Sequence, residues 1–137
     1  MSKVAIVFWS ATGNTETMAN CIAEGAGANG TIVPCAEMTP AKLAEFDVVA
    51  FGCPAMGAEV LEECEFEPFF TVLEGKLAGK KVALFGSYGW GGSYMQDWEA
   101  RVKDAGATLV ADGVLALGAP DDEAVAKLAE AGKLLAE

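Results

Sequence analysis

Histidine is missing from the sequence, and cysteine is scarce and without pattern. Without histidine, Ser-His-Asp triads and proton transfer by an imidazole are excluded for this chain. No two of the four cysteines are separated by two residues, which argues against a zinc site and against a dithiol redox centre. We therefore expect buried, reduced thiols at Cys21, Cys35, Cys53 and Cys64.

Basic residues are also few, since nine Lys and Arg stand against 20 Asp and Glu and the net charge is −11. Neutralisation of phosphates by basic side chains dominates the affinity for nucleic acids, so no nucleic-acid partner is expected. The negative field suits protein partners with basic docking surfaces. The alternative is that the charge serves solubility alone.

The sequence has no long hydrophobic run. None approaches the roughly 20 apolar residues of a membrane-spanning helix. The start, Met1-Ser2-Lys3, leads into a β-branched run without a cleavage site of small residues. We therefore expect no membrane association and a cytoplasmic location. The length of 137 residues favours one domain over 1–137 with one core, and we expect it to be a monomer.

What the sequence does contain is an alternation of short apolar runs with segments of helical spacing. Strands are predicted at 4–9, 31–33, 48–52, 81–85 and 108–117, the last as one strand or as a strand and its extension. Helices are predicted at 18–26, 40–43, 68–73, 95–105 and 121–137. Continuous apolar strands are typical of a parallel sheet that helices cover on both faces. Such a sheet binds ligands beyond the carboxyl ends of its strands.

Two of these helices carry more specific signals. Thr39 is expected to cap the second helix, with Pro40 as its first residue. Acids occupy the first turn of the terminal helix. Its inner face is expected to comprise Val125, Leu128, Ala129 and Leu135.

The loop after the first strand, Ser10-Ala11-Thr12-Gly13-Asn14-Thr15, combines polar side chains with the start of a helix. A phosphate can be held there by backbone N–H groups and the positive end of the helix dipole. The loop has neither the Gly-Lys-Ser/Thr of a Walker loop nor the glycines of a dinucleotide fingerprint. Because it also has no Lys or Arg, neutral groups would bind the anion. An ordinary helix cap is the alternative.

A tryptophan lies in the loop after the fourth strand, in the segment Gly86-Ser87-Tyr88-Gly89-Trp90-Gly91-Gly92. Trp90 stands between glycines and has no evident core to fill, so its indole is suited to lie on a planar ligand. Trp9 and Trp98, by contrast, end a strand and line the inner face of a helix, and both are expected to be structural.

Together these segments resemble the flavodoxin family. The Ser-x-Thr-Gly-Asn-Thr of 10–15 is similar to its phosphate loop, and 52–59 and 79–91 are similar to the two flavin loops of short-chain, clostridial-type members. The resemblance covers essentially the whole chain. It implies a doubly wound five-stranded parallel sheet of order 2-1-3-4-5 with helices on both faces. Flavodoxin is the type example of that order, with FMN at the switch point between strands 1 and 3.

The resemblance also implies roles for individual residues. The isoalloxazine would lie between Met56 and Trp90, Glu59 would accept from the flavin N3–H, and the Gly57 carbonyl would accept from N5 and stabilise the semiquinone. Ala58 follows where relatives often carry residues that tolerate a positive φ. The implied cofactor-binding residues are Ser10, Ala11, Thr12, Gly13, Asn14, Thr15, Pro54, Ala55, Met56, Gly57, Ala58, Glu59, Ser87, Tyr88, Gly89, Trp90 and Gly91.

Two positions depart from the family pattern. Pro54 replaces a hydroxyl donor of some relatives, which puts one phosphate contact in doubt. Tyr94 stands where close relatives have a second tryptophan, which puts its contact with the flavin in doubt.

The function implied is that of a low-potential one-electron carrier with non-covalent FMN, working between redox partner proteins rather than as an independent catalyst. One alternative is an FMN-dependent NAD(P)H:quinone reductase, which usually needs insertions that a chain of 137 residues lacks. Another is a phospho-signalling receiver domain. That class needs aspartates at strand ends, where this chain has Trp9 and Gly52.

Overall fold

The computed structural model describes residues 3–9, 13–53, 65–88, 93–111, 113–117 and 120–136. Its strands are β1 (Val4–Phe8), β2 (Gly30–Pro34), β3 (Val48–Gly52), β4 (Lys81–Tyr88), β5 (Thr108–Leu109) and β6 (Val114–Leu117). Its helices are α1 (Asn14–Ala26), α2 (Pro40–Leu43), α3 (Phe66–Glu74), α4 (Ser93–Asp104) and α5 (Asp122–Ala136). Short 3-10 turns occupy Gly27–Asn29 and Cys35–Glu37.

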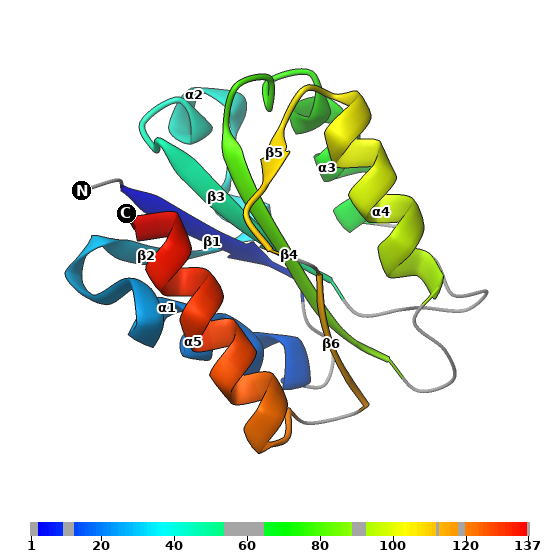
Figure 1. Ribbon diagram of the computed structural model, residues 1–137. Coiled ribbons are helices and arrows are strands. Elements are labelled where there is room, and N and C mark those ends of the chain that lie inside the picture. Colours follow the sequence, from blue (N-terminus) through cyan, green and yellow to red (C-terminus); the bar gives the residue numbers. More distant parts are fainter. Residues whose placement is uncertain are drawn as a thin grey trace.

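The strands form one parallel sheet in the order β2-β1-β3-β4-β5, with β6 also paired to β4 (Figure 1). This confirms the expected order 2-1-3-4-5. Phe8 of β1 lies opposite Gly52 of β3, and Gly52 lies opposite Phe85 of β4. The carboxyl ends of β1 and β3 are therefore level, and β4 continues beyond them to Tyr88.

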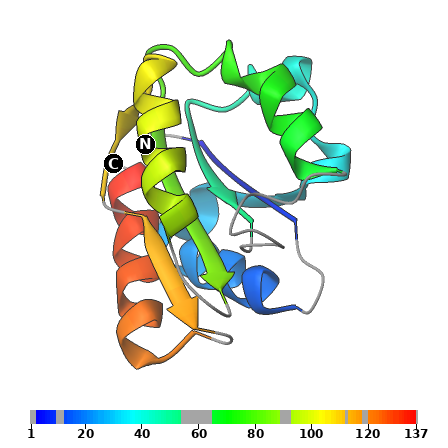
Figure 2. The ribbon, with the colours of Figure 1, turned by 90° about the vertical axis from the view of Figure 1, so that its right-hand side faces the viewer.

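Helices cover both faces of the sheet, with α1 and α5 on one side and α3 and α4 on the other (Figures 1 and 2). Side chains along β1 alternate between the two resulting cores. Ala5 and Val7 belong to the core under α3 and α4, whereas Val4, Ile6 and Phe8 belong to the core under α1 and α5. Because both faces are buried, the strands are continuously apolar in sequence.

Local signals set the ends of two helices as expected. The Thr39 hydroxyl accepts from the Lys42 N–H at 3.1 Å, with Pro40 as the first residue of α2. Helix α1 stops at Gly27, whose φ of 66° lies in the left-handed region that glycine adopts at low cost. Within the described residues, no helix combines the length and the apolar character needed to cross a bilayer.

The segment 108–117, expected as one strand or as a strand and its extension, forms two strands, β5 and β6. Leu109 of β5 lies opposite Val82, and Val114 of β6 lies opposite Phe85. The outer chain therefore advances by five residues where β4 advances by three. The two extra residues form an interruption like a bulge. The Gly113 N–H donates to Glu99 Oε2 at 2.8 Å, which ties this interruption to α4.

The inner face predicted for α5 is partly wrong. Val125 is 38% exposed, and Ala129 is only partly buried. The buried residues of α5 are Ala124, Leu128, Ala131, Gly132, Leu135 and Ala136. Ala124, Leu128, Ala131 and Leu135 follow the spacing of 3.6 residues per turn, and Val125 is turned by about 100° from Ala124.

Candidate functional site

The carboxyl ends of three strands meet at one edge of the sheet. Two hydrogen bonds beyond the regular ladder fix them: the Trp9 N–H donates to Gly52 O at 3.0 Å, and the Cys53 N–H donates to Phe85 O at 3.2 Å. The loops that leave β1 and β3 therefore start side by side, and β4 continues beyond them to Tyr88 at the same edge (Figure 2). This is the switch-point edge at which doubly wound sheets bind their ligands.

Helix α1 begins at this edge with a glycine cap. Gly13 has a φ of 92°, and its carbonyl accepts from both the N–H and the hydroxyl of Thr17, each at 3.0 Å. An added Cβ at Gly13 would meet nothing within 4 Å, so its backbone conformation, not lack of space, favours glycine. The positive end of the α1 dipole thus faces the strand ends, where an anion can be bound.

The residues expected to hold the phosphate are only partly within the described chain. Gly13 and Asn14 are half-buried at the start of α1, and Thr15 is buried, with 1% of its surface exposed. Ser10, Ala11 and Thr12 lie outside the described residues. The described part fits a phosphate bound by neutral groups, because the turn of α1 that faces the edge has no Lys or Arg.

The expected flavin loops are described only at their ends. Ser87 and Tyr88 are the last residues of β4, and their backbones lie opposite Ala116 and Leu117 of β6. The structure thus brings the end of β4 and the start of α1 to the same edge. The other expected contacts lie outside the described residues: Pro54, Ala55, Met56, Gly57, Ala58, Glu59, Gly89, Trp90 and Gly91.

The sequence did not predict where the side chain of Tyr94 lies. Only 3% of its surface is exposed, and it packs in the core under α3 and α4. Its hydroxyl donates to Cys53 O at 2.8 Å. Burial is the main cause that raises the pKa of Tyr94, with the neighbouring Cys53 thiol adding to it, so the phenol stays a hydrogen-bond donor at neutral pH.

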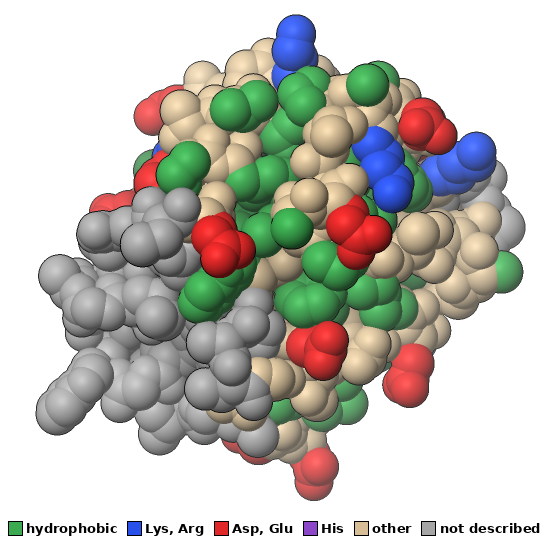
Figure 3. Space-filling model, turned by 180° about the vertical axis from the view of Figure 1, so that it is seen from behind, with side chains coloured by type: hydrophobic (Ala, Val, Ile, Leu, Met, Phe, Trp, Pro, Cys, Tyr) green, Lys and Arg blue, Asp and Glu red, His purple; other side chains and the backbone are tan. Residues whose placement is uncertain are grey.

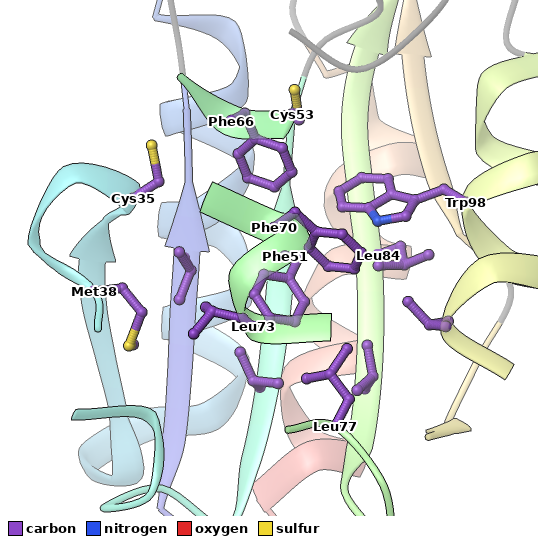
Figure 4. Close-up of a cluster of buried hydrophobic side chains, with 14 of the residues drawn as sticks. Cys35, Met38, Phe51, Cys53, Phe66, Phe70, Leu73, Leu77, Leu84 and Trp98 are labelled. Carbon is purple, nitrogen blue, oxygen red and sulfur yellow. The ribbon is translucent and has the colours of Figure 1, made fainter. Parts of the chain in front are cut away.

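The other two tryptophans are structural, as expected. Trp98 is 2% exposed and meets the rings of Phe66 and Phe70 edge-on, with centroids 5.6 and 5.7 Å away (Figure 4). Trp9 packs against the same core, and its indole N–H donates to Glu65 Oε2 at 3.3 Å. This bond connects the end of β1 to the residue that precedes α3.

The guanidinium of Arg101 joins α4 to α3, a contact that the sequence analysis missed. It lies 2.7 Å from Glu67 Oε1 and 2.8 Å from Glu74 Oε2, and it stacks on the Phe70 ring at 4.9 Å. The hydrogen bond from Arg101 lowers the pKa of Glu67. No sequence pattern relates residues 34 positions apart, so only the fold reveals this cluster.

Basic side chains avoid the edge where the three loops start. The segments 9–17, 53–66 and 86–93 contain no Lys or Arg. At the opposite end of the sheet, Lys3 precedes β1, Lys80 precedes β4, and Lys81 is the first residue of β4. On the face shown in Figure 3, Lys and Arg side chains lie in the upper part, whereas acidic side chains also occupy the lower part. The three segments themselves thus offer no cation to an anion bound at the edge.

Comparison with known proteins agrees with this geometry. The family profile described as Flavodoxin matches residues 6–132. The flavodoxin of Megasphaera elsdenii is 50% identical over 116 residues, which cover 82% of this chain and 85% of the relative. That of Clostridium beijerinckii is 46% identical over 135 residues, covering 96% and 97%.

The fold of the chain is also similar to that of a solved structure. The solution structure of two-electron reduced Megasphaera elsdenii flavodoxin superposes with a TM-score of 0.89 at 46% identity, covering 97% of this chain and 98% of that one. The sheet order, the glycine-capped helix at the switch point and these matches lead to one conclusion. The chain belongs to the flavodoxin family, the FMN-binding flavoproteins of electron transport.

Proposed function

We propose that this chain is a low-potential one-electron carrier that binds FMN non-covalently and works between redox partner proteins, not as an independent catalyst. The observation that carries the proposal is the edge at which β1, β3 and β4 end beside the glycine-capped start of α1. FMN has a phosphate for the helix end and a planar ring for the loops after β3 and β4.

The finer roles rest on the sequence motifs. We propose that Met56 and Trp90 cover the two faces of the isoalloxazine, where aromatic stacking adds about 0.5–1.5 kcal/mol beyond area burial. Glu59 would accept from N3–H, and the Gly57 carbonyl from N5 after one-electron reduction. A net hydrogen bond of about 1 kcal/mol corresponds to roughly 40 mV for a one-electron couple, at about 59 mV per tenfold change.

The charge distribution supports the low potential. Full reduction leaves FMN as an anion, in a chain of net charge −11 whose loops at this edge contain no base. Negative charge near the ring disfavours a further negative charge, so the second electron should be accepted only at a strongly reducing potential. The same field suits partners with basic docking surfaces.

We propose further that the carrier works as a single-domain monomer over 1–137, in the cytoplasm. Size-exclusion chromatography of the FMN-loaded protein tests the oligomeric state. A dimer at micromolar concentration would contradict that part of the proposal.

A visible-absorption redox titration tests the function. The protein loaded with FMN should be yellow, turn blue at half-reduction as the neutral semiquinone forms, and show two separated potentials. Hydride transfer from NADPH alone should be slow. Rapid steady turnover of NADPH with a quinone would instead favour the reductase alternative, and failure to bind FMN would refute the proposal.

A further inference from the structure

One buried hydrogen bond connects the start of the loop after β3 to α4, the helix that follows the loop after β4. Tyr94 is the second residue of α4, and its hydroxyl donates to the carbonyl of Cys53, the first residue after β3, at 2.8 Å. The two residues are 41 positions apart in the chain. Figure 4 shows Cys53 at the end of the aromatic core that also contains Phe66 and Trp98.

Cys53 is held from two directions. Its N–H donates to Phe85 O of β4 at 3.2 Å, and its carbonyl accepts from Tyr94 of α4 at 2.8 Å. The next residue is Pro54, which has no N–H. The peptide that leads into the loop therefore offers only its carbonyl as an anchor, and Tyr94 uses that anchor.

A glycine in β4 leaves the room for this bond. A Cβ on Gly86 would lie 2.1 Å from the Tyr94 hydroxyl oxygen and 2.2 Å from Cys53 O. Such distances are far below van der Waals contact, and Cys53 O is a backbone atom that cannot turn aside. Gly86 does not have a positive φ, so its role is space and not conformation.

We propose that the Tyr94–Cys53 hydrogen bond is a positioning element for the cofactor. It fixes the residue from which the loop 54–59 starts relative to the helix that follows the loop 89–91. If the ends of the loops are already fixed before FMN binds, less conformational entropy is lost on binding. The site then binds FMN more tightly. The inference rests on the proposed function, because those loops are the expected flavin loops. Tyr94 acts through Cys53, not by touching the flavin.

The first test is Tyr94→Phe, which keeps the buried ring and removes only the hydroxyl. We expect the Kd for FMN to rise about fivefold, as the loss of one net hydrogen bond would give. We also expect the first reduction potential to move, because Gly57 lies in the loop that Cys53 starts. If the Kd rises twofold more for one of the two redox states of FMN than for the other, the first reduction potential shifts by about 18 mV.

Thr39→Ala is the matched control. It also removes one hydrogen bond between a side chain and the backbone, the one at 3.1 Å to Lys42, but at the opposite end of the sheet. We expect a lower Tm with an unchanged Kd for FMN and unchanged potentials. All constants are measured at 25 °C, where each variant is checked by circular dichroism to be folded.

Gly86→Ala breaks the same bond from the strand side. It should weaken FMN binding at least as much as Tyr94→Phe, and the double variant should bind no more weakly than Gly86→Ala alone. If the increases in Kd caused by the two single substitutions multiply in the double variant, the two substitutions do not act on the same hydrogen bond.

The outcomes separate the two claims. If Tyr94→Phe lowers the Tm as Thr39→Ala does but keeps the wild-type Kd and potentials, the hydroxyl serves the fold alone and this inference is refuted. If the wild-type protein does not bind FMN, the proposed function fails, and the inference fails with it.

Discussion

The two sides of the sheet are packed by opposite means. Between α1 and α5 the helix backbones touch: a Cβ on Gly25 would lie 2.0 Å from Ala129 O, and one on Gly132 would lie 2.2 Å from Ile22 O. Under α3 and α4 the core is filled by large rings, among them Phe51 of β3 and Phe70 of α3, which meet edge-on with their centroids 5.1 Å apart. The first side should fail when residues are enlarged, and the second when they are reduced.

The difference follows what each side supports. Helix α1 begins at the expected phosphate loop, so its close packing on α5 fixes a helix end. Helices α3 and α4 each follow one of the expected flavin loops, and the side-chain contacts of Tyr94 and Arg101 join them to the sheet or to each other. One side therefore holds two helix backbones in direct contact, and the other holds α3 and α4 through side chains.

The largest effect is expected from a cavity on the aromatic side. Phe70→Ala should lower the free energy of unfolding by about 3–5 kcal/mol, because the buried ring contacts Phe51, Phe66 and Trp98. Urea denaturation of the FMN-free protein measures this. The control is Val72→Ala on the same helix, which is 61% exposed and should change little.

Enlargement should break the other side. Gly132→Ala is expected to cost about 1–3 kcal/mol, since the added Cβ would meet backbone atoms of α1 at 2.2 and 2.8 Å. Gly75→Ala is the control, because a Cβ there meets nothing within 4 Å. Equal stabilities of the two variants in urea would contradict the close approach of α1 and α5.

A smaller effect is expected at the polar cluster of α3 and α4. Arg101→Lys keeps the charge but loses the forked contacts with Glu67 and Glu74, and should cost about 1 kcal/mol in urea denaturation at pH 7.

The pH dependence of the wild type distinguishes this cluster from simple packing. The pKa of Glu67 in the folded state is lowered from its ordinary 4.5. Its stabilising contribution is therefore complete above pH 4.5 and is lost as the pH falls through the lower folded-state value. Arg101→Lys should lose less stability over this range. Parallel plots of the free energy of unfolding against pH for the wild type and Arg101→Lys would show that the hydrogen bond from Arg101 does not lower the pKa of Glu67.

The smallest effect is expected on the exposed surface of α5. Lys127→Ala removes a contact of 3.2 Å with Glu123, in which both side chains are more than half exposed. Such pairs contribute about 0.3–0.5 kcal/mol. A change above 1 kcal/mol in urea, or no reduction of a small effect by 1 M salt, would contradict a screened surface pair.

The sequence predicted those parts of the fold that local patterns encode. The apolar run of β1 and the Thr39-Pro40 signal at α2 depend on neighbours in the chain, and both predictions were confirmed. The sequence left open whether 108–117 is one strand or a strand and its extension, because a contact such as that between Gly113 and Glu99 of α4 cannot be read from neighbours in the chain. The hydroxyl of Tyr94 was missed for the same reason, since its partner lies 41 residues away. The expected roles of Met56, Gly57 and Trp90 stay predictions.

The interruption between β5 and β6 has a consequence for how copies of this protein meet. A long, flat outer strand presents an unbroken row of backbone donors and acceptors, on which a strand of another molecule can add. Here that row is divided into pieces of two and four residues. An incoming strand would therefore lose its register after a few hydrogen bonds at this edge, which should resist the addition of a strand from another copy.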